Sequence, residues 1–286
     1  MRAVNRNGVR PGLMPADVEM FTADVTDPTR ASAAANGADV VYQALNPPYH
    51  RWRELFPALQ TGALSAARAA NARYVSIENL YMYDSSRPMT EDSPVAPAST
   101  KGTLRQKMAQ EVMAAHLRGD IRATALRSSD YYGPGVLGSA LGERVFGNLV
   151  AGRKAQLTGS TKMSHSFSYI EDVGRAAAAL GTNDNALGQH WIAPHALART
   201  QGEMVEEACR VLGIAPRMRT VSPLMMRVAG LFVPDARASV EMMYEFTAPF
   251  VVDSSRIERA FHLAATPIPV GIERTVAWYR HHSARG

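Results

Sequence analysis

Strand-like and helix-like segments alternate along the first half of the chain, and this alternation constrains the fold more than any other feature. Short apolar runs rich in β-branched and aromatic residues occupy residues 2–5, 18–23, 39–45, 73–78 and 121–126. Helical periodicity lies between several of them, over 28–36, 50–71 and 103–118. Because strands joined through helices run parallel, we expect an α/β fold whose parallel sheet is covered by helices on both faces. A ligand site is then expected at the carboxyl ends of the strands.

Local signals place the ends of several helices. Asp27 can cap a helix that has Pro28 at its first position, and Asn36-Gly37 provides a stop. Thr200 and Glu203 are spaced as a capping box for a helix that reaches Leu212. Further helices are predicted over 171–181, 223–232, 237–246 and 270–281, and strands near 190–193 and 217–221. We therefore expect a sheet domain over residues 1–130 and a smaller C-terminal α/β lobe over 131–286, with one segment near 165–195 returning to the sheet.

Composition excludes several classes of protein. With 46% apolar and 20% charged residues, the chain is neither disordered nor fibrous. No apolar run approaches the roughly 18 residues of a membrane span, so no membrane partner is expected. Cys209 is the only cysteine, which suits a reducing compartment, and no secretory leader pattern opens the chain, so we expect a cytoplasmic location. The net charge of +5 is scattered without a basic run, so no nucleic-acid partner is expected.

Two common kinds of site are not expected either. His165, His190 and His195 lack the spacing of helical zinc ligands, so no metal site is predicted. A Ser-centred hydrolase is disfavoured because no G-x-S-x-G elbow occurs. The pattern G-x-G-x-x-G occurs only at 133–138, where Pro134 removes a backbone donor, and an irregular loop is the favoured interpretation.

Seven short motifs follow one another along the chain: Arg2–Arg6, Ala23–Asp27, Ala44–Pro47, Val75–Asp84, Lys107–Glu111, Leu126–Gly135 and Ser166–Val173. In this order and spacing the chain resembles the extended or atypical short-chain dehydrogenases, specifically the NAD-dependent epimerase/dehydratase family. The resemblance runs from the family's second strand to the C-terminus. It implies a Rossmann-like doubly wound sheet and NADP or NAD as cofactor. It also implies hydride transfer on a nucleotide-sugar or a related hydroxyl or ketone substrate.

The chain departs from the family in two places. The family's opening strand, Gly-rich loop and first helix have no counterpart before residue 2, which suggests a truncated gene model or a fragment. The family's Tyr-x-x-x-Lys dyad reads Thr103-x-x-x-Lys107 here, and an alkyl hydroxyl cannot replace the phenol as an acid or base. Lys107 is therefore either a ligand of the nicotinamide ribose or an exposed helical lysine paired with Glu111.

Other residues are candidates to carry the proton in place of the missing phenol. Tyr81 follows the fifth family strand and is the preferred acid, with Lys107 expected to lower its pKa; otherwise Tyr81 is a packing residue. Glu78 is a second candidate base, whose pKa would be raised if it is desolvated; the alternative is a solvated or salt-bridged carboxylate. Asn79 stands where the family has its catalytic Ser and can donate a hydrogen bond without relaying a proton.

The resemblance also implies residues at the cofactor. It places Asp24 at the adenine and Ala44 and Asn46 where the fourth family strand ends, beside the cofactor. Arg6, after the second family strand, favours a 2′-phosphate and hence NADP over NAD; the alternative is a turn residue, since a turn signal follows it.

Two functions of different kind therefore stay open. The first is an NAD(P)-dependent epimerase/dehydratase or oxidoreductase; the second is a non-catalytic NADP-binding regulatory protein of the same fold, favoured by the altered dyad. The helices over 50–71 and 103–118 correspond to the family's four-helix dimer interface, so a homodimer is expected. The sequence names neither the substrate nor the choice among epimerase, dehydratase and reductase.

Overall fold

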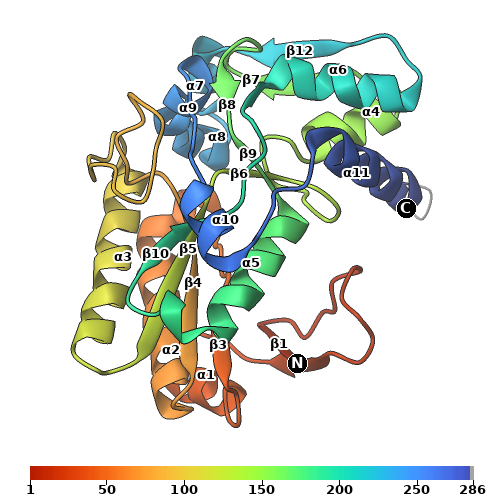
Figure 1. Ribbon diagram of the computed structural model, residues 1–286. Coiled ribbons are helices and arrows are strands. Elements are labelled where there is room, and N and C mark those ends of the chain that lie inside the picture. The colour runs from red at the N-terminus through yellow and green to blue at the C-terminus, as the bar shows by residue number, and fades with distance from the viewer. Residues whose placement is uncertain (284–286) are drawn as a thin grey trace.

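The computed structural model describes residues 1–283 and contains a four-stranded parallel sheet in the order β10-β5-β4-β3 (Figure 1). These strands span His190–Ile192, Arg122–Ser128, Arg73–Asn79 and Val40–Gln43. β4 is buried along most of its length because both faces of the sheet are covered. The predicted return of the chain near residue 190 corresponds to β10, which pairs with the outer edge of β5.

A second parallel pair, β1 (Arg2–Asn5) and β2 (Glu19–Thr22), stands apart from this sheet. Within residues 1–283, β1 bonds only to β2, and β3 bonds only to β4. The ladder is therefore interrupted between β1 and β3, where the family resemblance places its first strand. Packing of α1 (Pro28–Ala34) against α2 (Trp52–Ala69) bridges the interruption. Gly62 lets α2 approach the segment between β2 and α1, because a Cβ there would lie 1.7 Å from the Val25 carbonyl oxygen.

Helices cover the two faces of the four-stranded sheet. On one face lie α1, α2 and α3 (Thr100–Leu117), whose alanine-rich sides enclose Tyr74 and Ala123 of the sheet. On the other lie α5 (Ile170–Thr182) and α10 (Ser255–Phe261), which pack against Leu126 and Trp191. This is the doubly wound arrangement that the alternating pattern predicted.

The C-terminal part builds a separate core around α6 (Gln201–Leu212) and α11 (Ile268–Ser283). Its short strands are β6 (Asp130–Tyr132), β7 (Ala155–Thr158), β8 (Ser164–His165), β9 (Phe167–Tyr169), β11 (Arg199–Thr200) and β12 (Met218–Val221). β7 pairs with β12 and β6 with β9, both in parallel. The remaining helices are α4 (Asn148–Val150), α7 (Pro223–Ala229), α8 (Pro234–Ser239) and α9 (Tyr244–Thr247).

Most predicted helix ends are confirmed. Asp27 accepts from the amides of Thr29 and Arg30, and Thr200 and Glu203 form the reciprocal capping box. The predicted helix over 237–246 is wrong in detail, because Pro234 starts α8 earlier and a 3-10 turn at Val240–Met242 separates it from α9. The helix predicted over 103–118 begins at Thr100, with Ser99 as its cap. α10 is not foreseen by the sequence.

Candidate active site

The segments that follow β3, β4 and β5 meet at the carboxyl edge of the sheet. They bring together Tyr49 from the turn before α2, Tyr81 after β4, and Asp130 after β5. Parallel strands place their carboxyl ends at one edge, so residues distant in the sequence converge there. This edge is where the sequence predicted a ligand site.

Tyr81 is held in the turn after β4 by several contacts. Its amide donates to the Asn79 side-chain oxygen at 3.3 Å, and its ring stacks on Trp52 with centroids 6.1 Å apart. The Tyr49 hydroxyl donates to the Tyr81 hydroxyl at 3.3 Å. α3 approaches this turn closely, since a Cβ at Gly102 would lie 2.3 Å from the Tyr81 carbonyl oxygen. The position of Tyr81 is therefore fixed from three sides.

The pKa of the Tyr81 hydroxyl is raised well above its ordinary value, by burial first and then by the negative charge of Glu245. Burial and Glu245 raise the pKa of Tyr49 in the same direction. The expectation that Lys107 lowers the pKa of Tyr81 is therefore wrong in direction. A phenol in this environment stays protonated at neutral pH and acts as a hydrogen-bond donor.

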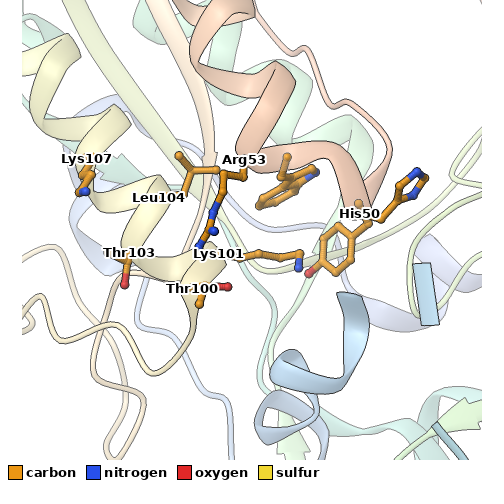
Figure 2. A pocket seen from close by; sticks show the side chains of 9 residues that line it. His50, Arg53, Thr100, Lys101, Thr103, Leu104 and Lys107 are labelled. Atoms are coloured by element: carbon orange, nitrogen blue, oxygen red, sulfur yellow. The ribbon is translucent and has the colours of Figure 1, made fainter. Parts of the chain in front are cut away.

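Thr103 and Lys107 lie on the exposed side of α3 (Figure 2). The Thr103 hydroxyl donates to the Ser99 carbonyl at 3.1 Å. Lys107 forms no ion pair with Glu111, whose carboxylate instead accepts from Gln60 at 2.8 Å.

The same four-residue spacing recurs two positions earlier in α3, with both side chains buried. Lys101 bonds to Glu241 at 2.8 Å and lies 4.6 Å from the centre of the Tyr49 ring. Arg105 donates to the Ile77 carbonyl at 3.4 Å beneath the sheet edge. The sequence analysis missed this pair because it aligned the family's Tyr-x-x-x-Lys dyad on Lys107. Its signal was the repetition of basic residues four positions apart.

Glu78 forms an ion pair with Arg127, the residue directly opposite it in the β4–β5 ladder. The two side chains are 1% and 5% exposed and 3.0 Å apart. Ser76 donates to the other carboxylate oxygen at 3.0 Å, and Arg127 also donates to the Tyr83 hydroxyl. Because the Glu78 carboxylate is paired with Arg127 and accepts from Ser76, the salt-bridged interpretation of Glu78 describes its geometry.

Three acid–base residues that the sequence analysis did not select lie behind Tyr81: Asp130, His165 and Glu245. Glu245 is 2% exposed, and one of its carboxylate oxygens has no hydrogen-bond partner among the described residues. Burial, and then the charge of Asp130, raises the pKa of Glu245 well above its ordinary value. A carboxyl group of this kind holds its proton at a pH where others have lost it. Its sequence signal was a single acid within the apolar run 242–246.

His165 is stacked among Phe167, Phe246 and Phe250. Its Nδ1 lies 3.2 Å from the Glu245 carbonyl oxygen, which can only accept, so Nδ1 carries a proton. Its Nε2 lies 3.0 Å from Asp130 Oδ2, an ion-pair distance without hydrogen-bond alignment. The same Nε2 lies 3.3 Å from the Ser129 hydroxyl, so the His165 ring is held from both of its nitrogens.

The predicted cofactor residues lie near the other end of the same edge. Arg6, Ala44 and Asn46 are exposed at the ends of β1 and β3. Asp24 accepts from the Thr26 amide at 2.9 Å and hydroxyl at 2.7 Å, and these bonds lower its pKa.

These residues fit the adenosine end of a dinucleotide, because Arg6 and Asn46 offer accessible donors. The pyrophosphate end does not fit, since no Gly-rich strand-to-helix turn lies between β1 and β3 within residues 1–283. Gln43, which is 2% exposed at the end of β3, has no hydrogen-bond partner for its side-chain amide oxygen or nitrogen among residues 1–283.

Neither a metal cluster nor a membrane span is found in the part of the chain that the structure describes. No group of three or more His, Cys, Asp or Glu residues could hold an ion there. None of the helices in that part is long and apolar enough to cross a membrane.

Solved structures share this fold at low sequence identity. A dTDP-glucose 4,6-dehydratase double mutant from Streptomyces venezuelae, crystallised with NAD and DAU, superposes with a TM-score of 0.76 at 20% identity, over 94% of this chain and 82% of that one. A UDP-glucuronic acid 4-epimerase from Bacillus cereus, in complex with UDP-glucuronic acid and NAD, gives 0.77 at 16% identity, over 98% and 91%. MoeE5, in complex with UDP-glucuronic acid and NAD, gives 0.76 at 18% identity, over 98% and 91%.

Sequence comparison extends this likeness from fold to family. No match is found among curated proteins. The sequence model described as the NAD dependent epimerase/dehydratase family matches residues 2–192, about two thirds of the 286 residues. Its span covers every strand of the four-stranded sheet. The chain therefore belongs to the NAD dependent epimerase/dehydratase family.

Proposed function

We propose that this protein is an NAD(P)-dependent enzyme of the epimerase, dehydratase or reductase type, acting on a nucleotide-sugar or a related hydroxyl or ketone substrate. The observation that carries the proposal is the convergence of Tyr81 and Glu245 at the carboxyl edge of the sheet, where burial raises the pKa of both side chains and Asp130 and His165 lie beside them. Structures of the same fold bind NAD together with nucleotide-sugars, which supports this substrate class.

Each side chain then has a defined part in the chemistry. NAD(P), when bound, supplies the hydride acceptor or donor. Tyr81, kept protonated by burial, donates a hydrogen bond to the substrate oxygen that gains or loses charge. Glu245 takes up or releases the proton, because its raised pKa brings it toward the working range of an acid–base catalyst. Asn79 positions the Tyr81 backbone.

The test is turnover of UDP- and dTDP-linked sugars with millimolar NAD or NADP. Glu245→Gln and Tyr81→Phe should each lower turnover by about 10²–10⁴-fold, the usual range for general acid–base catalysis. Thr103→Ala, on the exposed side of α3, is the matched control and should cost little. Full activity in both variants would refute the assignment. If no sugar is turned over although NADP binds tightly, the non-catalytic regulatory alternative replaces the enzyme.

For the cofactor, we propose NADP over NAD because Arg6 is exposed at the end of β1 without an acid beside it in the strand. A guanidinium–phosphate contact is worth roughly 1.5–3 kcal/mol, so in a chain supplied with the family's Gly-rich strand-turn-helix Arg6→Ala should weaken NADP binding about ten- to a hundredfold. NAD binding should stay nearly unchanged, which calorimetry can compare directly. Equal losses for both cofactors would show that Arg6 has only a structural role.

Two organisational predictions remain proposals. We propose a division near residue 130 into a cofactor domain and a substrate lobe. We also propose a homodimer through α2 and α3, as the family resemblance implies. Light scattering should then give twice the 31.0 kDa of one chain. The mass of a single chain at micromolar concentration would contradict the dimer.

A further inference from the structure

A pocket of about 500 Å³ opens between the first turns of α2 and α3, outside the buried cluster behind Tyr81 (Figure 2). Its lining includes no acid, and besides Thr100, Thr103 and Leu104 it consists of basic and aromatic side chains: Tyr49, His50, Trp52, Arg53, Lys101 and Lys107. Figure 2 shows Arg53 from α2 and Lys101 from α3 extending into the space between the two helices. The pocket is therefore concave, positively charged and walled on one side by aromatic rings.

Only two of these four basic residues are matched by acids. His50 pairs with Asp235 at 2.6 Å, and Lys101 pairs with Glu241 at 2.8 Å. Arg53 and Lys107 have no acidic partner within 4 Å among residues 1–283. Like charges that face one pocket without a counterion raise its affinity for anions. The pocket has room for a doubly charged group that would balance both.

One wall of the pocket already binds an anionic group of the protein itself. The Glu241 carboxylate accepts from the Thr100 amide at 2.7 Å, from the Thr100 hydroxyl at 2.6 Å and from the Lys101 ammonium. This set of donors at the start of α3 is one that recognises carboxylates and phosphates.

We propose that this pocket binds a phosphate-bearing ligand, with Arg53 and Lys107 contacting the phosphate oxygens. A phosphate dianion matches the two unpaired charges, and a guanidinium can bind two of its oxygens at once. Tyr49 and Trp52 provide apolar walls for the remainder of the ligand. Glu241 carries a competing negative charge at the rim. The inference requires neither cofactor nor turnover, so its failure would leave the proposed enzyme untouched.

Calorimetry at low ionic strength tests the site, with inorganic pyrophosphate and UDP as probes. Arg53→Gln and Lys107→Gln should each weaken binding by about tenfold or more, and the double variant further. Both side chains are exposed, so the variants should keep the thermal midpoint of the wild type. Arg118→Gln, at the opposite end of α3, removes the same charge and should leave affinity unchanged. Glu241→Gln should tighten binding severalfold, because a repelling charge is lost.

The two probes distinguish the sources of the phosphate. Tighter binding of UDP than of pyrophosphate assigns the pocket to a nucleoside diphosphate that also contacts the aromatic wall. Equal affinities assign it to a free phosphate anion. The proposal is overturned if the Arg53→Gln/Lys107→Gln protein binds both probes within twofold of the wild type. It is also overturned if Arg118→Gln loses as much affinity as either pocket variant.

Discussion

Replacing Glu78 by Gln should destabilise the protein strongly, whatever its effect on activity. The Glu78–Arg127 ion pair lies between neighbouring strands of the sheet, with side chains 1% and 5% exposed. Gln keeps the shape but removes the negative charge, so the buried Arg127 charge is left beside the neutral amide and the Tyr83 hydroxyl. Breaking one side of a buried pair costs about 3–5 kcal/mol. At roughly 2 °C per kcal/mol, the low end for chains of 150–250 residues, the midpoint should fall by about 6–10 °C.

A double-mutant cycle separates this effect from general damage to the sheet. Arg127→Met alone leaves Glu78 unpaired and should cost a similar amount, whereas the Glu78→Gln/Arg127→Met protein should recover much of the loss. Urea unfolding followed by circular dichroism measures all four proteins. Glu54→Gln, which breaks the exposed Arg51–Glu54 pair, is the control and should show no measurable loss. Additive losses in the double variant, or an unchanged midpoint for Glu78→Gln, would refute the reasoning.

Three further outcomes follow from the described geometry. Because the pKa of Glu245 is raised in the folded state, the free energy of unfolding of the wild type should fall as pH rises from about 4.3, the ordinary Glu pKa, to the raised pKa, by about 1.4 kcal/mol per pH unit. Urea unfolding of Glu245→Gln between pH 4 and 8 should lack this slope. Identical slopes in the two proteins would contradict the assignment. Gly102→Ala should lower the thermal midpoint, at a cost of roughly 1–3 kcal/mol, because its Cβ would lie 2.3 Å from the Tyr81 carbonyl oxygen. Gly174→Ala, in α5 with nothing within 4 Å, should be neutral or stabilising, and the reverse ranking would be inconsistent with the packing. Calorimetry on the 286-residue chain should show neither NADP nor NAD binding tighter than about 0.1–1 mM, because no Gly-rich strand-to-helix turn lies between the edges of β1 and β3 within the described residues. A micromolar Kd would contradict this.

Periodicity and capping signals were sufficient to predict the sheet and most helices. Alternating apolar runs gave β3, β4 and β5, and Asp27 and Thr200 marked helix starts that the structure confirms. These signals depend on residues close together in the sequence, so they can be recognised without knowledge of the tertiary fold. The helix over 237–246 was harder to predict, because the break in it depends on how residues 234–247 pack against other elements.

The site was harder to predict, for physical reasons that differ between residues. The apolar residues of α3 are spread around the helix, so periodicity could not show that Lys101 and Arg105 are buried while Thr103 and Lys107 are exposed. Glu245 and Asp130 are separated by more than a hundred residues in the sequence, so only the tertiary fold brings them together. The direction of a tyrosine's pKa shift depends on such neighbours, which is why the expectation for Tyr81 failed.

The interruption between β1 and β3 has a consequence for how the molecule opens. The pair β1–β2 and helix α1 are joined to the rest by the α1–α2 contact, by the short loop into β3 and by the bond from the Ser32 hydroxyl to the Ser65 carbonyl at 3.5 Å. Residues 1–38 can therefore detach without breaking a single ladder bond of the four-stranded sheet, which makes them a separate cooperative unit. In native-state hydrogen exchange, the amides of β1 and β2 should be released at a lower free energy than those of β4 and β5.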